Sequence, residues 1–129
     1  MSVVEIDGYG YIGYISIPKL GLDLPVMADC DLTRLKTAPC RFSGSTFTDD
    51  LVIAAHNYTS HFGYIADLEA GDTLTFTDMD GIVTSYVVSS VETLDATDVE
   101  KMTSSGHPLT LFTCNMSGQA RITVRCETQ

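Results

Sequence analysis

The chain has 129 residues and a net charge of −10, with 7 Lys and Arg against 17 Asp and Glu. This length suits one domain with one hydrophobic core, and a hydrophobic content of 44% is ordinary for a globular protein. No stretch approaches the ~20 apolar residues of a membrane-spanning helix, and the acidic balance excludes the clustered cations that bind nucleic-acid backbones or anionic lipid.

The N-terminus carries no signal peptide, because it has neither a basic region nor an apolar run. Either the protein is cytosolic, or an N-terminal export or anchor segment has been removed. We expect residues 1–8 to be a loose lead-in and residues 9–129 to form the domain.

Apolar and β-branched residues alternate along several short stretches, and turn residues separate them. Strands are predicted at 9–18, 22–27, 51–55, 73–77, 82–91, 109–114 and 120–125. Helical turns are predicted at 31–37, 59–68 and 95–102, and a loop at 41–50. Seven or eight short strands without long helices favour a mainly antiparallel barrel or sandwich over a βαβ fold.

Reactive side chains stand at the ends of two of these strands. Cys114 ends the strand 109–114, and a short polar loop separates it from Arg121 on the returning strand. A hairpin of this shape places Cys114 and Arg121 close together across the loop. His56 follows the apolar run 51–55.

Together these three side chains could carry acyl transfer through a thioester. A thiol with an ordinary pKa of about 8.5 is mostly protonated at neutral pH, and a nearby imidazole and guanidinium favour the reactive thiolate. His56 can protonate a leaving amine, and Arg121 can donate to an oxyanion or orient the substrate.

Each of these residues also has an ordinary structural interpretation. Cys114 can be a buried thiol, His56 a hydrogen-bonded structural residue and Arg121 a solvated surface residue. Cys30 and Cys40 flank one polar segment and are the first pair to test for a disulfide, with buried free thiols as the alternative. No Cys-x-x-Cys spacing is present, so no metal site is predicted.

Four motifs, in order along the chain, resemble those of the sortases, the cysteine transpeptidases of Gram-positive bacterial surfaces. Residues 109–114 resemble the family's T-L-x-T-C signature, and residues 121–125 resemble its Arg-containing strand. Residues 12–20 with 24–26 resemble the opening of the catalytic domain, and residues 51–56 resemble the strand that ends on the family's His. The resemblance covers most of the chain.

The resemblance implies a closed, antiparallel-rich, eight-stranded β-barrel with two or three short helices. It implies that Cys114 attacks a sorting signal of the L-P-x-T-G type, with His56 as acid and base and Arg121 at the oxyanion. Their neighbours Thr113, Ala55 and Asn57 are expected to contact substrate.

The implied partners are surface proteins with a C-terminal sorting signal, and a peptidoglycan precursor or pilin that supplies the accepting amine. The implied location is the extracellular face of the cell membrane, with an anchor N-terminal to the domain. Two other activities stay open: a cysteine hydrolase that uses water, and a catalytically silent β-domain that binds peptide.

No cofactor is expected. Some sortases use calcium, and Asp67, Glu69 and Asp72 form an acidic group that could bind it. A solvated acidic surface is the preferred interpretation of these three residues.

Overall fold

The computed structural model describes residues 2–35, 37–56, 65–94, 106–114 and 121–129. Strands dominate these residues, and the only helical elements among them are single short turns. The strands are β1 (Val4–Ile6), β2 (Tyr9–Ile17), β3 (Leu22–Met27), β4 (Cys40–Ser43), β5 (Leu51–His56), β6 (Thr73–Asp78), β7 (Val83–Leu94), β8 (Leu109–Cys114) and β9 (Arg121–Thr128). The helical elements are α1 (Leu32–Leu35) and two 3-10 turns, Pro18–Leu20 and Ile65–Asp67.

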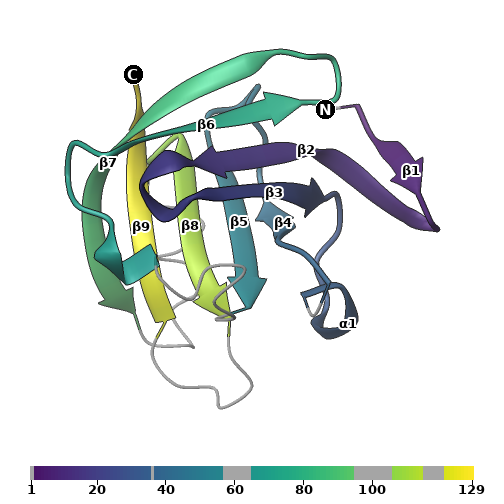
Figure 1. The fold of residues 1–129 in the computed structure, drawn as a ribbon, viewed down its shortest axis with the longest axis horizontal. Helices are drawn as coiled ribbons and strands as arrows, with labels where there is room; N and C mark the ends of the chain where they lie inside the picture. Colours follow the sequence, from purple (N-terminus) through teal and green to yellow (C-terminus); the bar gives the residue numbers. More distant parts are fainter. Residues whose placement is uncertain (1, 36, 57–64, 95–105, 115–120) are drawn as a thin grey trace.

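The strands form a closed barrel (Figure 1). Their order is β1-β2-β3-β4-β5-β8-β9-β7-β6, and β6 also pairs with β2, which closes the ring of β2 to β9 and leaves β1 outside it. The pairs β3–β4 and β5–β8 are parallel, and the other pairs are antiparallel. The predicted eight-stranded, mainly antiparallel barrel is therefore confirmed, as a mixed barrel.

Two hydrophobic clusters lie on opposite faces of the β5–β8 pair. The larger, which we call the inner cluster, fills the barrel and includes Leu51, Ile53, Ala55, Leu109, Leu111, Val124 and Cys126. The smaller, which we call the outer cluster, consists of Met27, Leu35, Ala38, Cys40, Val52, Ala54 and Phe112. Since side chains alternate along a strand, burial on both faces explains the continuous apolar run 51–55.

Two local expectations are wrong. Residues 4–6 are not a loose lead-in, because β1 pairs with β2 across an Asp7–Gly8 turn. Both turn residues have positive φ, as a tight hairpin turn with native twist requires. The expected loop 41–50 begins later, because β4 extends to Ser43 by pairing with β5, a partner that local sequence does not reveal.

The three predicted helical segments have different outcomes. The predicted turn at 31–37 is confirmed by α1, where the Arg34 backbone N–H donates to Asp31 Oδ1 at 2.7 Å and so caps the helix. Of the helix expected at 59–68, the described part contains only the 3-10 turn Ile65–Asp67. The helix expected at 95–102 lies outside the described residues. No helix in the described part of the chain has the length and apolarity to span a membrane.

Candidate active site

The parallel strands β5 and β8 bring two predicted site residues together. The strands are in register from Leu51 opposite Leu109 to His56 opposite Cys114. Parallel neighbours point the same way, so both strands end at one edge of the barrel. The backbones of His56 and Cys114 are therefore adjacent, although their positions are far apart in the sequence.

The antiparallel strand β9 brings the third residue to the same edge. β8 and β9 pair from Leu109 opposite Cys126 to Phe112 opposite Thr123, and continuing this register by two residues sets Cys114 opposite Arg121. The Ile122 backbone N–H donates to Thr113 Oγ1 at 3.2 Å, which keeps the strands together there. Figure 1 shows the ends of β5 and β8 beside the start of β9.

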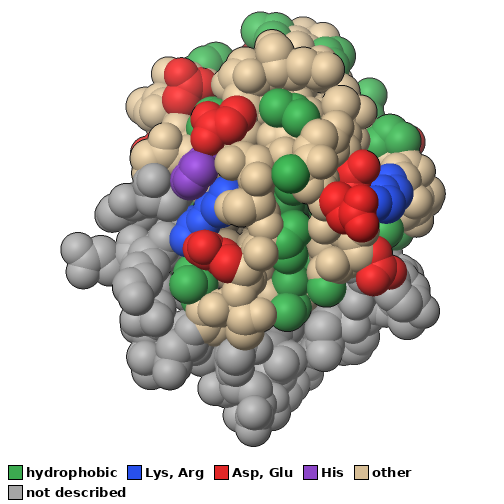
Figure 2. Space-filling view, turned by 90° about the vertical axis from the view of Figure 1, so that its left-hand side faces the viewer, with side chains coloured by type: hydrophobic (Ala, Val, Ile, Leu, Met, Phe, Trp, Pro, Cys, Tyr) green, Lys and Arg blue, Asp and Glu red, His purple; other side chains and the backbone are tan. Residues whose placement is uncertain are grey.

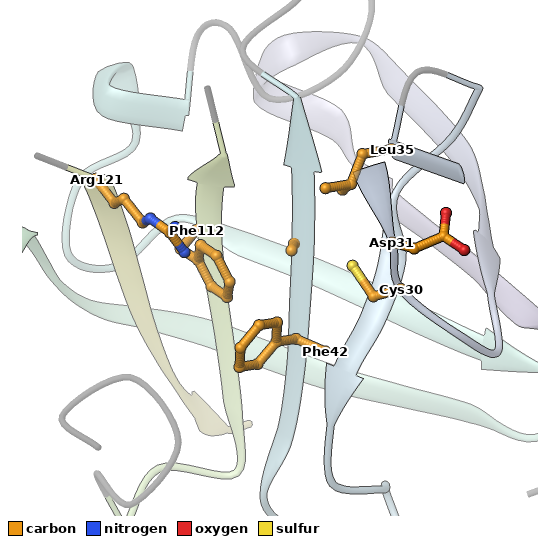
Figure 3. Close-up of a pocket in the computed structure, with 7 residues that line it drawn as sticks. Cys30, Asp31, Leu35, Phe42, Phe112 and Arg121 are labelled. Atoms are coloured by element: carbon orange, nitrogen blue, oxygen red, sulfur yellow. The ribbon is translucent and has the colours of Figure 1, made fainter. Parts of the chain in front are cut away.

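A pocket of about 190 Å³ lies on the outer face beside this edge. The pocket is mostly apolar, and Arg121 is the basic side chain in its wall. Its lining residues are Cys30, Asp31, Leu35, Phe42, Ala54, Phe112 and Arg121. Figure 3 shows Cys30 and Leu35 directed toward Phe112 and Arg121, whereas the Asp31 carboxylate turns away. Ala54 and Phe112 stand two residues before His56 and Cys114 on their strands, so the pocket adjoins the three predicted residues.

Aromatic rings hold the Arg121 guanidinium in the pocket. Its central carbon lies 5.3 Å from the centroid of the Phe112 ring, within cation–π range. The Phe42 ring meets Phe112 edge to face, with centroids 5.2 Å apart and an interplanar angle of 81°. The sequence analysis gave neither Phe112 nor Phe42 a role in the site. The position of Phe112 two residues before Cys114 was the available signal.

The second arginine of β9 has a different role. Arg125 is buried at 4% exposure, and its Nε donates to Glu92 Oε1 at 3.1 Å. Its Nη1 donates to Thr110 Oγ1 at 3.2 Å. These contacts join β7, β8 and β9, so Arg125 serves the fold, and Arg121 is the arginine presented to the pocket.

The residues expected to contact substrate are not brought to the pocket as a group. Ala55 belongs to the inner cluster and has 0% exposure, because strand alternation turns it into the barrel. The structure therefore does not bring the Ala55 side chain to the pocket. Thr113 is buried and uses its hydroxyl oxygen to accept the Ile122 N–H. Asn57 lies outside the described residues.

Cys30 and Cys40, the pair considered for a disulfide, are free thiols in the structure, which is the alternative that the sequence left open. Cys40 belongs to the outer cluster, and the half-buried Cys30 packs against that cluster. A hydrogen bond from Cys40, with the nearby charges of Arg121 and Arg34, lowers the pKa of Cys30. Cys126 is a free thiol of the inner cluster, where burial raises its pKa to about 12.

The acidic group considered for calcium is engaged by protein groups. Asp72 Oδ2 accepts from Lys19 Nζ at 2.9 Å and from the Glu69 backbone N–H at 2.8 Å. These hydrogen bonds lower the pKa of Asp72. Figure 2 shows the same pattern more widely, with basic side chains beside acidic ones. Across the described ranges, no group of three or more His, Cys, Asp or Glu residues is placed to hold a metal ion.

Comparison with known proteins gives a consistent result. The family model of the Sortase domain matches residues 15–129. Among solved structures, sortase C1 from Streptococcus agalactiae has a TM-score of 0.77 at 25% identity, over 97% of this chain and 70% of that one. Sortase A from Corynebacterium diphtheriae has a TM-score of 0.77 at 21% identity, over 94% of this chain and 61% of that one.

A third structure is Clostridium perfringens sortase C with the C-terminal cell wall sorting motif. It has a TM-score of 0.78 at 21% identity, over 92% of this chain and 70% of that one. No curated protein sequence matches this chain. The chain thus has the barrel of these proteins and spans under two thirds of the length of the Corynebacterium enzyme.

Proposed function

The chain belongs to the sortase family, and from this premise we propose that it is a cysteine transpeptidase acting on an L-P-x-T-G-like sorting signal. It cleaves the signal through a thioester on Cys114 and transfers the acyl group to an amine. The substrates are surface proteins with a C-terminal signal, and the acceptor amine belongs to a peptidoglycan precursor or a pilin. The reaction takes place at the extracellular face of the bacterial cell membrane.

The observation that carries this proposal is the strand register. His56 pairs with Cys114 across two parallel strands, and the continued β8–β9 register sets Arg121 opposite Cys114. Nucleophile, acid–base group and cation of an acyl-transfer site must lie within a few ångströms of one reacting carbonyl. The neighbouring ends of β5, β8 and β9 support the proposal, because they bring the backbones of His56, Cys114 and Arg121 to one edge of the barrel.

The chemistry divides into two acyl transfers. The Cys114 thiolate attacks the carbonyl carbon of the signal's Thr, and the resulting oxyanion accepts hydrogen bonds from Arg121. His56 gives its proton to the departing Gly amine, and the thioester forms. The acceptor amine then attacks the thioester, His56 takes the amine's proton, and the Cys114 thiolate leaves.

The pocket supports a peptide substrate with a small apolar side chain. At about 190 Å³ it is smaller than a typical pocket for a drug-sized ligand, roughly 300–1,000 Å³. It offers the Phe42 and Phe112 rings and the methyl group of Ala54 to one such side chain. Arg121, at the edge of the pocket, reaches the peptide carbonyl that follows.

A ligation assay tests the proposal directly. An internally quenched peptide library with L-P-x-T-G cores is incubated with the protein, with and without a glycine or lysine amine, and products are identified by mass spectrometry. A ligated product that requires the amine is expected. Cleavage without ligation would instead identify a cysteine hydrolase, and binding without cleavage would identify a silent peptide-binding domain.

The role of Arg121 is tested by Arg121→Lys. Lysine keeps the charge but loses the planar fork that stacks on Phe112 and donates to an oxyanion, so kcat/KM should fall about 10²–10³-fold. Arg34→Lys is the matched control. Lysine keeps the positive charge beside Asp31, and this position lies away from the strand ends, so kcat/KM should stay within about twofold of the parent value. Equal losses in both variants would show that Arg121 has no special role.

A further inference from the structure

Cys30 and Cys40 are held beside each other by the backbone around them. The Met27 N–H donates to the Pro39 carbonyl oxygen at 2.9 Å, which pairs the end of β3 with the start of β4. Arg41 Nε donates to the Ala28 carbonyl oxygen at 3.2 Å. Pro39 and Arg41 flank Cys40, and Cys30 follows Ala28 by two residues, so these contacts hold the segment that leads to Cys30 against both neighbours of Cys40.

The two cysteines differ in access. Cys30 lines the pocket, where Figure 3 shows its sulfur directed inward. Cys40 is buried at 0% exposure in the outer cluster, behind the pocket wall. Its single S–H proton has two acceptors within reach, the Ala38 carbonyl oxygen at 3.4 Å and the Cys30 sulfur. A thiol that lines the pocket is thus backed by a buried thiol of the cluster against which it packs.

We propose that Cys30 and Cys40 form a redox-active dithiol, which exchange with a low-molecular-weight disulfide converts reversibly into an intramolecular disulfide in the pocket wall. Cys30 is the attacking thiol because a disulfide can reach it through the pocket. Cys40 is the resolving thiol because it belongs to the cluster against which Cys30 packs and is closed to solvent. The proposal depends on these two residues alone and not on the transpeptidase activity.

The exchange balances as two substitutions at sulfur. The Cys30 thiolate attacks one sulfur of the small disulfide, releases one thiol and forms a mixed disulfide. Cys40 then loses its proton and attacks Cys30 Sγ, releasing the second thiol and forming the Cys30–Cys40 bond. The two protein thiols are oxidised, and the small disulfide is reduced to two thiols.

The surroundings of the pair favour this order of events. The Cys40 hydrogen bond and the Arg121 and Arg34 charges lower the pKa of Cys30, which favours its reactive thiolate. The pKa of Cys40 is raised by its hydrogen bond to Cys30 and by burial, which keeps this thiol protonated until exchange begins. Cys30 adjoins Arg121 in the pocket, so the oxidation state of the pair alters the charge that Arg121 faces.

The experiment uses the full chain carrying Cys114→Ala, so that the predicted catalytic thiol cannot react. The protein is incubated with oxidised glutathione, quenched with acid and alkylated, and its intact mass and disulfide-linked peptides are measured. We expect the loss of two hydrogen atoms, a Cys30–Cys40 peptide link, and full reversal by dithiothreitol. A lasting glutathione adduct without closure, a link to Cys126, or no reaction would each overturn the proposal.

Three variants on this background assign the roles. Cys40→Ala should accumulate the Cys30–glutathione adduct, which persists at least tenfold longer than in the parent protein. Cys30→Ala should react at least tenfold more slowly with glutathione, because only buried thiols remain among the described cysteines. Cys126→Ala, the matched buried control, should still close the Cys30–Cys40 bond.

Circular dichroism and thermal unfolding establish that each variant is folded. Should Cys40→Ala fail to fold, Cys40→Val provides the same test with more of the cavity filled. Loss of two hydrogen atoms in the Cys30→Ala or Cys40→Ala protein would mean that another cysteine forms the disulfide and would contradict the assignment. Because no sorting peptide is involved, failure here is distinct from failure of the transpeptidase proposal.

Discussion

The two faces of the β5–β8 pair show how one pair of strands serves both stability and chemistry. On the inner face, Leu51, Ile53, Ala55, Leu109 and Leu111 all have 0% exposure and fill the barrel. On the outer face, Val52, Ala54 and Phe112 are equally apolar, and Ala54 and Phe112 line a pocket. The strands therefore stabilise the barrel with one set of residues and border the pocket with the other.

The described thiols make the same contrast. Cys126 lies in the inner cluster, and burial there raises its pKa to about 12. Cys30 lies at the outer pocket, where hydrogen bonding and cationic neighbours lower its pKa. The same functional group is inert on one face and reactive on the other, because a closed apolar core disfavours the thiolate and a pocket with cations favours it.

The largest effect is expected for Cys114→Ala. Removing the nucleophile should lower the ligation rate by at least about 10⁴-fold, because the remaining groups can only polarise and position the peptide. The measurement is the ligation assay with the protein in excess over peptide, with circular dichroism as the control for folding. A residual rate above one hundredth of the parent would contradict the assignment.

Leu111→Ala should act on stability instead. Leu111 is fully buried in the inner cluster, so its truncation should lower the free energy of unfolding by about 2–5 kcal/mol in urea titrations. Val83→Ala, at a position 57% exposed on β7, is the control and should stay within about 0.5 kcal/mol. The ligation rate of the folded Leu111→Ala protein should remain within about threefold of the parent. A loss of ligation activity without a loss of stability would contradict the assignment of the inner face to stability alone.

Alkaline pH should lower the free energy of unfolding through Cys126 of the inner cluster. An unfolded Cys has a pKa of about 8.5, whereas Cys126 in the fold has a raised pKa of about 12 because it is buried. As pH rises above 8.5 the unfolded chain loses this proton first, so the free energy of unfolding falls until the folded pKa is reached. Between pH ~8.5 and ~10 the Cys126 contribution should be about 1–2 kcal/mol.

Cys126→Ala tests this pH dependence. The variant should be less stable at pH 7 because of the cavity it leaves, but its stability should fall less steeply between pH 8.5 and 10. Urea titrations at three pH values give the slope. Equal slopes in the parent and the variant would show that Cys126 ionises as readily in the fold as in the unfolded chain.

The smallest effect is expected for Phe112→Leu. Leucine keeps most of the apolar contact but removes the ring under the Arg121 guanidinium, so kcat should fall about 3–10-fold, the worth of an ordinary cation–π contact. Stability should fall by less than about 1.5 kcal/mol. Phe112→Tyr, which keeps a ring, should recover kcat if it folds. A change in KM alone would indicate that Phe112 contacts substrate and does not position Arg121.

Local sequence patterns were sufficient for most of the strands and for the family. The alternation of 22–27 and 109–114 is present in both the sequence and the fold. β1 and β4 were missed, because each is stabilised by a partner strand and neither has a strong pattern of its own. Sequence reasoning could not tell that the Ala55 side chain lies inside the barrel, because closeness to His56 in sequence says nothing about which face of the sheet a residue occupies.

The amino-acid sequence by itself determined that this is one acidic, strand-rich domain of the sortase family, with His56, Cys114 and Arg121 as its chemical candidates. Only the tertiary structure decided that β5 and β8 are parallel neighbours, that Phe112 lies beneath Arg121, and that Cys30 opens into the pocket while Cys40 supports it from behind. The physical reason is the distance along the chain over which each interaction acts. Propensity and alternation act within a few residues, whereas strand pairing and pocket walls depend on contacts between distant segments that form only as the barrel closes.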